Sequence, residues 1–241
     1  MRIVAVVQAR MGSARLPGKM LADIGGRPAL AHVLTRAAAI TPLNDVILAI
    51  PESPEDDRLE RVGEGCGVRV IRGDRDDVLS RYWTAAAASG ADAVIRVTGD
   101  CPLLDPAIAS LVVRRFLEGD VDYVSNTQPP TFPDGYDTEV MSVQSLEAAW
   151  RDAVDRFERE HVTPFIWRRR NRFRVANVVA GIDRSLVRLT LDTADDLERI
   201  RRIWGRLGAH PTFGLDEVVS LLDDDPALLA DVSIPIRAAV H

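Results

Sequence analysis

The sequence has no hydrophobic run long enough to cross a membrane, and the apolar stretch at its N-terminus is too short for a signal peptide. It has only two cysteines, Cys66 and Cys101, whose spacing fits neither a metal site nor a disulfide framework, as expected in the reducing cytoplasm. It has no excess of basic residues, because the net charge is −6, which argues against a nucleic-acid partner. These absences favour a soluble cytoplasmic protein, and 241 residues suffice for one full-sized core.

Lysine is nearly absent. Of the 30 basic residues, Lys19 is the only lysine and all the others are arginine. A solvated surface cation in such an arginine-rich chain is itself expected to be arginine, so this lysine either arose by chance or has a task that arginine cannot perform. The compact ammonium group can enter a narrow phosphate pocket that the wide, planar guanidinium does not fit. The residues that precede Lys19 favour the second explanation.

A basic loop that contains glycine leads to Lys19. The almost wholly apolar run 3–7 is typical of a buried parallel strand, and residues 8–19 follow it with two glycines, a serine and two arginines. The backbone N–H groups and cations of such a loop suit a triphosphate or pyrophosphate, and open α/β sheets bind ligands at this end of a strand. The loop lacks the spacing of a Walker loop and of G-x-G-x-x-G, and an ordinary basic surface loop is the alternative interpretation.

Strand-like and helix-like segments alternate along the first half of the chain. We expect strands at residues 3–7, 45–50, 68–71 and 93–97, and helices at 28–40, 55–64, 76–89 and 106–117. The less regular second half has expected strands at 139–142 and 187–191 and expected helices at 145–156, 194–207 and 215–222. Right-handed crossovers between such strands give a mainly parallel sheet flanked by helices, so the predicted fold class is α/β. The simplest assignment is a single domain, 1–241, with a small inserted lobe at about 127–185.

Two aspartates are candidate metal ligands. Asp100 follows the expected strand 93–97 in a tight turn, where its carboxylate would face the phosphates held by the first loop. Asp192 follows the expected strand 187–191, and Mg²⁺ is commonly bound by one or two carboxylates together with substrate phosphates. Each has a structural alternative, since Asp100 can form a turn through its own backbone and either Asp192 or Thr193 can cap the helix that follows.

Further candidates lie in the second half of the chain. An acidic cluster suits a polyhydroxylated or amine-bearing acceptor better than a second anion, and it consists of Asp134, Tyr136, Asp137 and Glu139. His161 is a candidate acceptor ligand or general base, or alternatively a residue that orients a helix or lies in a dimer interface. The arginine-rich run 168–174 is either a contact for an acidic acceptor or a solvated helix end.

Several of these motifs resemble the cytidylyltransferases that activate acidic sugars, such as 3-deoxy-manno-octulosonate and the sialic-acid-like sugars. The most specific is residues 8–19, Q-A-R-M-G-S-A-R-L-P-G-K, with the continuation L-x-x-I-x-G-x-P. Residues 98–103 and 189–197 resemble the two metal-carboxylate segments of that family. The segments that resemble the branch of spore coat polysaccharide biosynthesis protein F are 73–82, 134–140 and 158–164. The resemblance covers roughly residues 1 to 210.

The resemblance implies a Rossmann-like nucleotidyltransferase (GT-A-like) fold, a homodimer, and CTP bound along the first loop beside Mg²⁺. The nucleotide-binding residues that it implies are Gln8, Ala9, Arg10, Met11, Gly12, Ser13, Arg15, Lys19, Asp77, Arg81, Thr98 and Gly99. The implied catalytic residues are Arg15, Lys19, Asp100 and Asp192, of which Asp100 and Asp192 would bind the metal. The candidate acceptor-binding residues come from the acidic cluster and the histidine themselves and are Asp134, Tyr136, Asp137, Glu139 and His161. An acceptor oxygen would attack the α-phosphorus and release pyrophosphate, so no protein nucleophile is required.

Three functions from different classes remain. The first is a cytidylyltransferase that makes a CMP-activated acidic sugar or small phosphonate, for example for polysaccharide biosynthesis. The second is a glycosyltransferase of the same general fold. Asp74-Arg75-Asp76 has the Asp-x-Asp pattern of such enzymes, but the better-placed strand end at 98–101 has one aspartate only. The third, a non-catalytic nucleotide-binding protein, has no need of two metal carboxylates. The sequence favours the first.

Overall fold

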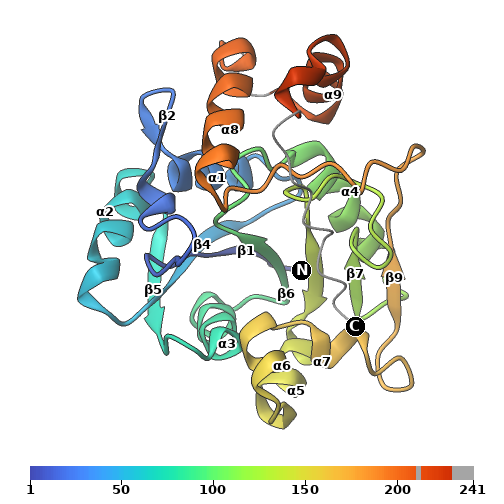
Figure 1. The fold of residues 1–241 in the computed structure, drawn as a ribbon. Helices are drawn as coiled ribbons and strands as arrows, with labels where there is room; N and C mark the ends of the chain where they lie inside the picture. Colours follow the sequence, from blue (N-terminus) through green and yellow to red (C-terminus); the bar gives the residue numbers. More distant parts are fainter. Residues whose placement is uncertain (210–212, 230–241) are drawn as a thin grey trace.

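The computed structural model describes residues 1–209 and 213–229 of the chain. Its centre is a seven-stranded sheet with the strand order β5-β4-β1-β6-β8-β7-β9 (Figure 1). The strands are β1 Ile3–Gln8, β4 Asp45–Pro51, β5 Arg69–Gly73, β6 Ala93–Thr98, β7 Tyr123–Ser125, β8 Glu139–Ser142 and β9 Val175–Asn177. β8 runs antiparallel to its neighbours β6 and β7, and every other pair in this sheet is parallel. The predicted α/β class with a mainly parallel sheet is therefore confirmed.

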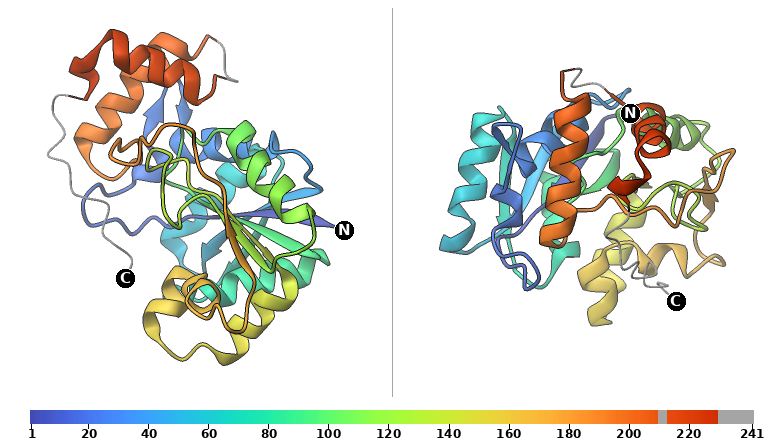
Figure 2. Two further views of the ribbon diagram at one scale, coloured as in Figure 1. Left: turned by 90° about the vertical axis from the view of Figure 1, so that its right-hand side faces the viewer. Right: turned by 45° about the horizontal axis from the view of Figure 1, so that its top comes forward.

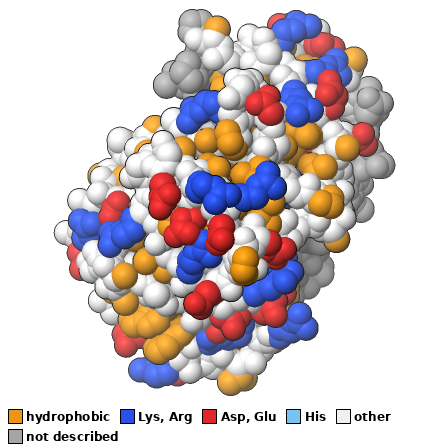
Figure 3. Space-filling view, turned by 90° about the vertical axis from the view of Figure 1, so that its left-hand side faces the viewer, with side chains coloured by type: hydrophobic (Ala, Val, Ile, Leu, Met, Phe, Trp, Pro, Cys, Tyr) orange, Lys and Arg blue, Asp and Glu red, His pale blue; other side chains and the backbone are white. Residues whose placement is uncertain are grey.

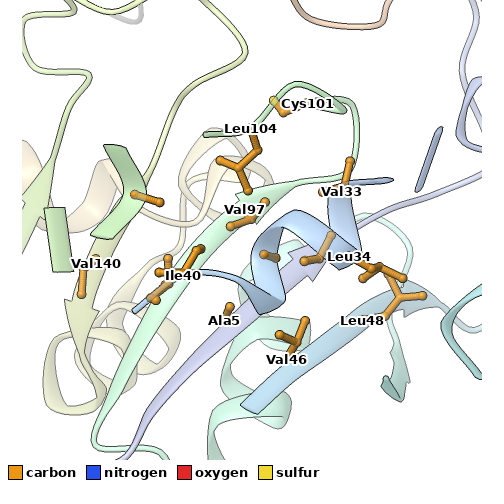
Figure 4. Packing of buried hydrophobic residues seen from close by; sticks show 14 of the residues in the cluster. Ala5, Val33, Leu34, Ile40, Val46, Leu48, Val97, Cys101, Leu104 and Val140 are labelled. Atoms are coloured by element: carbon orange, nitrogen blue, oxygen red, sulfur yellow. The ribbon is translucent and has the colours of Figure 1, made fainter. Parts of the chain in front are cut away.

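Helices cover both faces of the sheet because the side chains of each buried strand alternate between two apolar cores. Ala5 and Val7 of β1 pack with α1, α2 and α4, whereas Val4 and Val6 pack with α3, α5 and α7. Figure 4 shows the first of these cores, in which Leu34 of α1 lies over the sheet near Leu48. The helices of the two faces are α1 Ala29–Ala38, α2 Asp57–Gly65, α3 Val78–Ser89, α4 Pro106–Leu117, α5 Val143–Asp152, α6 Arg156–His161 and α7 Pro164–Trp167.

A third apolar cluster joins the C-terminal helices to the rest of the protein. α8 (Ala194–Leu207) and α9 (Leu215–Asp224) stand together at one end of the molecule, away from α3 and α5 (Figure 2). α8 also contacts a small hairpin made of β2 (Asp23–Ile24) and β3 (Arg27–Pro28). The buried residues that connect these elements include Ile24, Leu189, Leu191, Ile200 and Trp204. Short 3-10 helices lie at η1 Lys19–Leu21, η2 Pro54–Asp56 and η3 Pro226–Leu228.

The second half of the chain differs from the expectation in three respects. The segment 187–191 is not a strand of the sheet, since it forms one isolated bridge, between Arg188 and Asp134. β7 and β9 are only three residues long each, and no sequence pattern predicts them. The segment 127–185, expected as an inserted lobe, supplies β8 and β9 to the central sheet and α5 to α7 to one of its faces.

Charges of both signs are mixed on the face that carries α2 and β5 (Figure 3). Arg72 of β5 donates hydrogen bonds to Asp57 at 2.7 Å and to Glu60 at 2.5 Å, both on α2. Within residues 1–209 and 213–229, no helix has the length and apolar composition that crossing a membrane requires.

Candidate active site

A cleft of about 430 Å³ opens at the carboxyl ends of β1 and β6, which are adjacent in the sheet. The chain runs outward from β1 to β4 and β5 and then returns to β6 on the other side of β1. Ligands of open α/β sheets bind at such a reversal of strand order. The cleft is lined by Gln8, Ala9, Arg10, Gly12, Ser13, Ala14, Arg15, Lys19, Met20, Val78, Arg81, Thr98, Gly99, Asp100, Glu160, His161 and Asp192.

Gly99 allows the end of β6 to approach the end of β1 closely. Its backbone N–H donates a hydrogen bond to the Gln8 carbonyl oxygen at 2.8 Å. A Cβ atom on Gly99 would lie 2.8 Å from that same oxygen and 3.1 Å from the Cβ of Ala9, which is too close for any side chain. Only glycine therefore fits, and the close approach places the next residue, Asp100, beside the first loop.

The Lys19 side chain connects two carboxylates across the cleft. Its ammonium nitrogen lies 2.9 Å from Asp100 Oδ2 and 2.8 Å from Asp192 Oδ1, and the residue is only 8% exposed. Burial lowers the pKa of this ammonium, but the charges of Asp100 and Asp192 and their hydrogen bonds outweigh burial and raise the pKa. The predicted proximity of Asp100 and Asp192 is thus present, and one buried positive charge holds them together.

Asp192 has further partners besides Lys19. The guanidinium of Arg15 lies 3.0 Å from Oδ1, and Arg188 donates to Oδ2 at 3.0 Å. The backbone N–H of Asp192 donates to Asp196 at 3.0 Å, while Thr193 and Asp196 form the capping box of α8. Burial raises the pKa of Asp192, but its cationic partners, led by the ammonium described above, lower it overall. Thr193 is therefore the helix cap, and the Asp192 side chain remains directed at the cleft.

The two carboxylates fit a divalent cation. They are oxygen ligands, both line the cleft, and they already share one positive charge. In the described part of the chain, no group of three or more His, Cys, Asp or Glu residues could hold a metal ion. A cation here would therefore take its remaining ligands from substrate and water, which is how Mg²⁺ is commonly bound.

The predicted nucleotide-binding residues at the start of α3 separate into two groups. Arg81, 2% exposed, lines the cleft and donates hydrogen bonds to two backbone carbonyls of the turn before α3. Asp77 does not line the cleft. One of its carboxylate oxygens accepts a hydrogen bond from the Ser80 N–H at 2.9 Å, and the other pairs with Arg159 of α6. Met11 also lies off the cleft wall, and its backbone N–H donates to the carboxylate that ends η2.

Two of the predicted acceptor-binding residues are buried in the protein. Tyr136 is 1% exposed within the third apolar cluster, and Glu139 is 5% exposed. Glu139 accepts hydrogen bonds from Tyr123 at 2.5 Å and Thr163 at 2.6 Å and pairs with Arg96. The assignment of Tyr136 and Glu139 to acceptor binding is therefore corrected: neither side chain lines the cleft, and the Glu139 carboxylate is bonded internally.

The other two members of the acidic cluster, Asp134 and Asp137, do not line the cleft. Asp134 forms two backbone hydrogen bonds with the segment that leads to Asp192. Its N–H donates to the Val187 carbonyl at 2.9 Å, and its carbonyl accepts from the Leu189 N–H at 2.8 Å. Burial and the charge of the neighbouring aspartate raise the pKa of the Cys101 thiol, and the charges of Asp137 and Asp134 add to this increase. Asp134 and Asp137 are therefore near enough to Cys101, the neighbour of Asp100, for their charges to act on its thiol, but neither lines the cleft.

His161 does line the cleft, together with its neighbour Glu160. Glu160 lies 3.9 Å from Arg10 of the first loop and was not among the predicted site residues. Its place beside His161 in the motif 158–164 is the signal that could have identified it. Burial and then the charge of Arg96 lower the pKa of His161, so its imidazole is neutral near pH 7.

A strained turn follows His161. Val162 has φ 71° and ψ −59°, the one positive φ of a non-glycine residue in the described ranges. The Thr163 N–H donates to the His161 carbonyl at 2.8 Å, which makes this a classic γ-turn. Such backbone strain costs on the order of 1–3 kcal/mol and persists only where surrounding contacts impose it.

Comparison with known proteins identifies similar chains. The family model described as Cytidylyltransferase matches residues 4–210. Spore coat polysaccharide biosynthesis protein SpsF of Bacillus subtilis is 31% identical over 93% of this chain and 95% of the relative. The 3-deoxy-manno-octulosonate cytidylyltransferase of Geobacter sulfurreducens is 39% identical, but over 49% of this chain and 46% of the relative. The solved structure of a cytidylyltransferase from Leptospira borgpetersenii has a TM-score of 0.92 and 30% identity, covering 97% of this chain and 99% of that one.

Proposed function

The chain belongs to the cytidylyltransferase family, and we propose that it transfers the CMP group of CTP to a sugar acid, with Mg²⁺, and releases pyrophosphate. Family membership makes it a nucleotidyltransferase enzyme. The observation that carries the finer proposal is the meeting of the basic loop 8–19 with Asp100 and Asp192 in one cleft at the strand-order reversal. One bound triphosphate could therefore contact both the cations of the loop and a metal ion held by the two carboxylates.

The phosphates of CTP would lie along the first loop. Arg10 and Arg15 have side chains that are 46% and 61% exposed at the cleft, so both can turn toward an incoming triphosphate. Thr98 and Gly99 at the end of β6 and the buried Arg81 also line the cleft and would contact the base and ribose. The loop would supply cations and backbone N–H groups, and the β6 wall would supply shape.

Asp100 and Asp192 would hold the Mg²⁺, which neutralises charge on the phosphoryl oxygens when it is bound. The protein's own residues account for the remaining chemistry. An acceptor oxygen forms a bond to the α-phosphorus, the bond from this phosphorus to the bridging oxygen breaks, and pyrophosphate leaves with that electron pair. Lys19 and Arg15 stabilise the departing charge, and the neutral imidazole of His161 accepts the acceptor's proton.

The acceptor that we propose is a sugar acid. The relatives support this class, since one carries a name from spore coat polysaccharide biosynthesis and another is named for 3-deoxy-manno-octulosonate. Glu160 and His161, which line the cleft, offer hydrogen-bond acceptors for its hydroxyl groups. A small phosphonate is the competing acceptor.

We propose that two copies of the chain associate through loops of the segment 127–185. Val179 and Ile182 are 60% and 66% exposed, and Leu186 just after them is 76% exposed. Exposed apolar side chains so close together are typical of an association surface. Sedimentation of the wild type and of Ile182→Asp tests this, because a dimer held there would dissociate in the variant, whereas a monomeric wild type would contradict the proposal.

The function is tested by ligand-induced stabilisation followed by an activity assay. We expect CTP with Mg²⁺ to raise the melting temperature of the purified protein, while ATP, GTP, UTP and UDP-sugars leave it nearly unchanged. Pyrophosphate release from CTP is then measured with 3-deoxy-manno-octulosonate, a sialic acid and a phosphonate as acceptors. Stabilisation by UDP-sugars with no response to CTP would instead indicate a glycosyltransferase.

A further inference from the structure

A buried polar cluster lies behind the part of the cleft wall that α6 provides. Glu139 of β8 stands opposite Arg96 of β6 in the antiparallel register, and the two side chains form an ion pair. The other carboxylate oxygen of Glu139 accepts hydrogen bonds from Tyr123 of β7 and from Thr163, which follows α6. The Glu139 carboxylate thus joins three strands of the sheet to the chain that leaves α6.

Thr163 ends a turn that its central residue does not favour. Val162 is β-branched and adopts φ 71°, a conformation that L side chains rarely take. Its side chain is fully buried in the second apolar cluster, which also contains Leu79, Tyr82, Phe165 and Ile166. Surrounding contacts must therefore impose the turn, and the hydrogen bond from the Thr163 hydroxyl to Glu139 is the polar contact that fixes its far end.

The turn determines where the last residues of α6 lie. Glu160 and His161 line the cleft immediately before the turn, whereas Thr163 immediately after it is 2% exposed and directed inward. A relaxed, helical Val162 would extend α6 and change the direction of the chain between these residues. We propose that Glu139 and Thr163 are positioning residues, which impose the γ-turn and so hold His161 and Glu160 in the cleft wall.

This proposal rests on the proposed function, because it takes the cleft to be the active site. It also gives Glu139 a role in place of acceptor binding. Arg96 is two residues before Thr98 on the same strand, so the cluster links the β6 side of the cleft to the α6 side. The α6 wall is in addition tied to the start of α3 through Arg159 and Asp77.

The test compares three conservative variants. Thr163→Val removes the hydroxyl but keeps the shape of the side chain, Thr163→Ser keeps the hydroxyl, and Tyr123→Phe removes the other hydrogen bond to the same Glu139 oxygen. The first readout is the NMR titration of the His161 imidazole, assigned with His161→Gln. The second is the rate at which diethyl pyrocarbonate modifies that imidazole. Melting temperatures establish that each variant is folded.

We expect Thr163→Val alone to change His161. Its pKa would rise toward the ordinary histidine value, because the exposed ring would leave the cleft wall and the nearby charge of Arg96, which helps to lower its pKa, and its rate of modification would change several-fold. Thr163→Ser and Tyr123→Phe would match the wild type. Wild-type behaviour of folded Thr163→Val would overturn the proposal, and so would an equal effect of Tyr123→Phe, since the carboxylate rather than the turn would then govern His161.

Titration with Mg²⁺ and CTP separates this proposal from the proposed function. If the wild type is not stabilised by CTP, the proposed function fails, whatever the imidazole measurements show. If the wild type is stabilised and Thr163→Val binds CTP with an unchanged His161 signal, the positioning role alone fails. Support for both requires that CTP perturbs the wild-type His161 resonance and that this perturbation is lost in Thr163→Val and restored in Thr163→Ser.

Discussion

Replacing Lys19 by methionine removes the positive charge that touches both Asp100 and Asp192. We expect the nucleotide-free Lys19→Met protein to bind Mn²⁺, a spectroscopic substitute for Mg²⁺, more tightly than the wild type. The reason is competition: a metal that binds both carboxylates of the wild type must first displace the ammonium. The same variant should release pyrophosphate more slowly, since the departing phosphates lose their cation.

The magnitude follows from the two contacts. A hydrogen bond to a charged group contributes about 1.5–3 kcal/mol, and the lower value applies because the carboxylate side chains are 28% and 17% exposed. Two such contacts amount to about 3 kcal/mol, and about 1.4 kcal/mol corresponds to a factor of ten in affinity. Lys19→Met should therefore bind Mn²⁺ roughly a hundredfold more tightly than the wild type.

Electron paramagnetic resonance of free Mn²⁺ during a protein titration measures this affinity directly. Arg15→Met is the matched control, because Arg15 also contacts Asp192 at 3.0 Å but is 61% exposed and reaches only one carboxylate. Its gain in Mn²⁺ affinity should be less than about tenfold. Equal or weaker Mn²⁺ binding by Lys19→Met, or an equal gain in Arg15→Met, would refute the reasoning, as would an unchanged gain when Asp100→Asn is added.

Three further predictions follow from the contacts of single residues. Gly99→Ala should lose about 1–3 kcal/mol of unfolding free energy and weaken CTP binding, because its Cβ would lie 2.8 Å from a backbone oxygen of β1. Gly181→Ala, with open space around it, should leave both measurements unchanged. Burial lowers the pKa of His32, so protons bind preferentially to the unfolded state, and stability should fall as the pH drops below about 6.5. Urea unfolding at successive pH values should show a smaller loss in His32→Gln. Because burial raises the pKa of the Cys101 thiol, iodoacetamide should alkylate the half-exposed Cys66 first in the native protein, and mass spectrometry of digests would show the order.

The strands in the first half of the chain can be predicted from short apolar runs in the sequence. The runs at 3–7 and 93–97 are almost wholly apolar and each is followed by a segment that contains glycine, and both are central strands that pair in parallel. The segment 187–191 misleads, because its alternating Val187, Leu189 and Leu191 suggest a strand, yet they pack against the third apolar cluster from an extended segment with one bridge. β7 and β9 are too short for any periodicity to show.

The candidate site is predictable to a similar extent. Residue type and position after a strand select Lys19 and Asp100, because those signals are local, whereas Asp192 is selected at the end of an expected strand, 187–191, that the structure does not contain. The burial of Glu139 could not be deduced in this way, since its main partner, Arg96, is 43 positions away and meets it only through the β6–β8 register. A carboxylate in an acidic run suggests a surface cluster until its cross-strand neighbour is known.

The joining of Lys19 to Asp192 also has a consequence for biosynthesis. The two residues are 173 positions apart, and β1 lies in the middle of the sheet between strands that are made later. A ribosome needs about 9 to 35 s to add that length of chain. During this interval the growing polypeptide contains Lys19 from the beginning and Asp100 from about halfway, but it does not yet contain Asp192. The pair is completed only when Asp192, just before α8, has been synthesised, so a ribosome-bound fragment that stops before Asp192 has the basic loop 8–19 without the complete carboxylate pair.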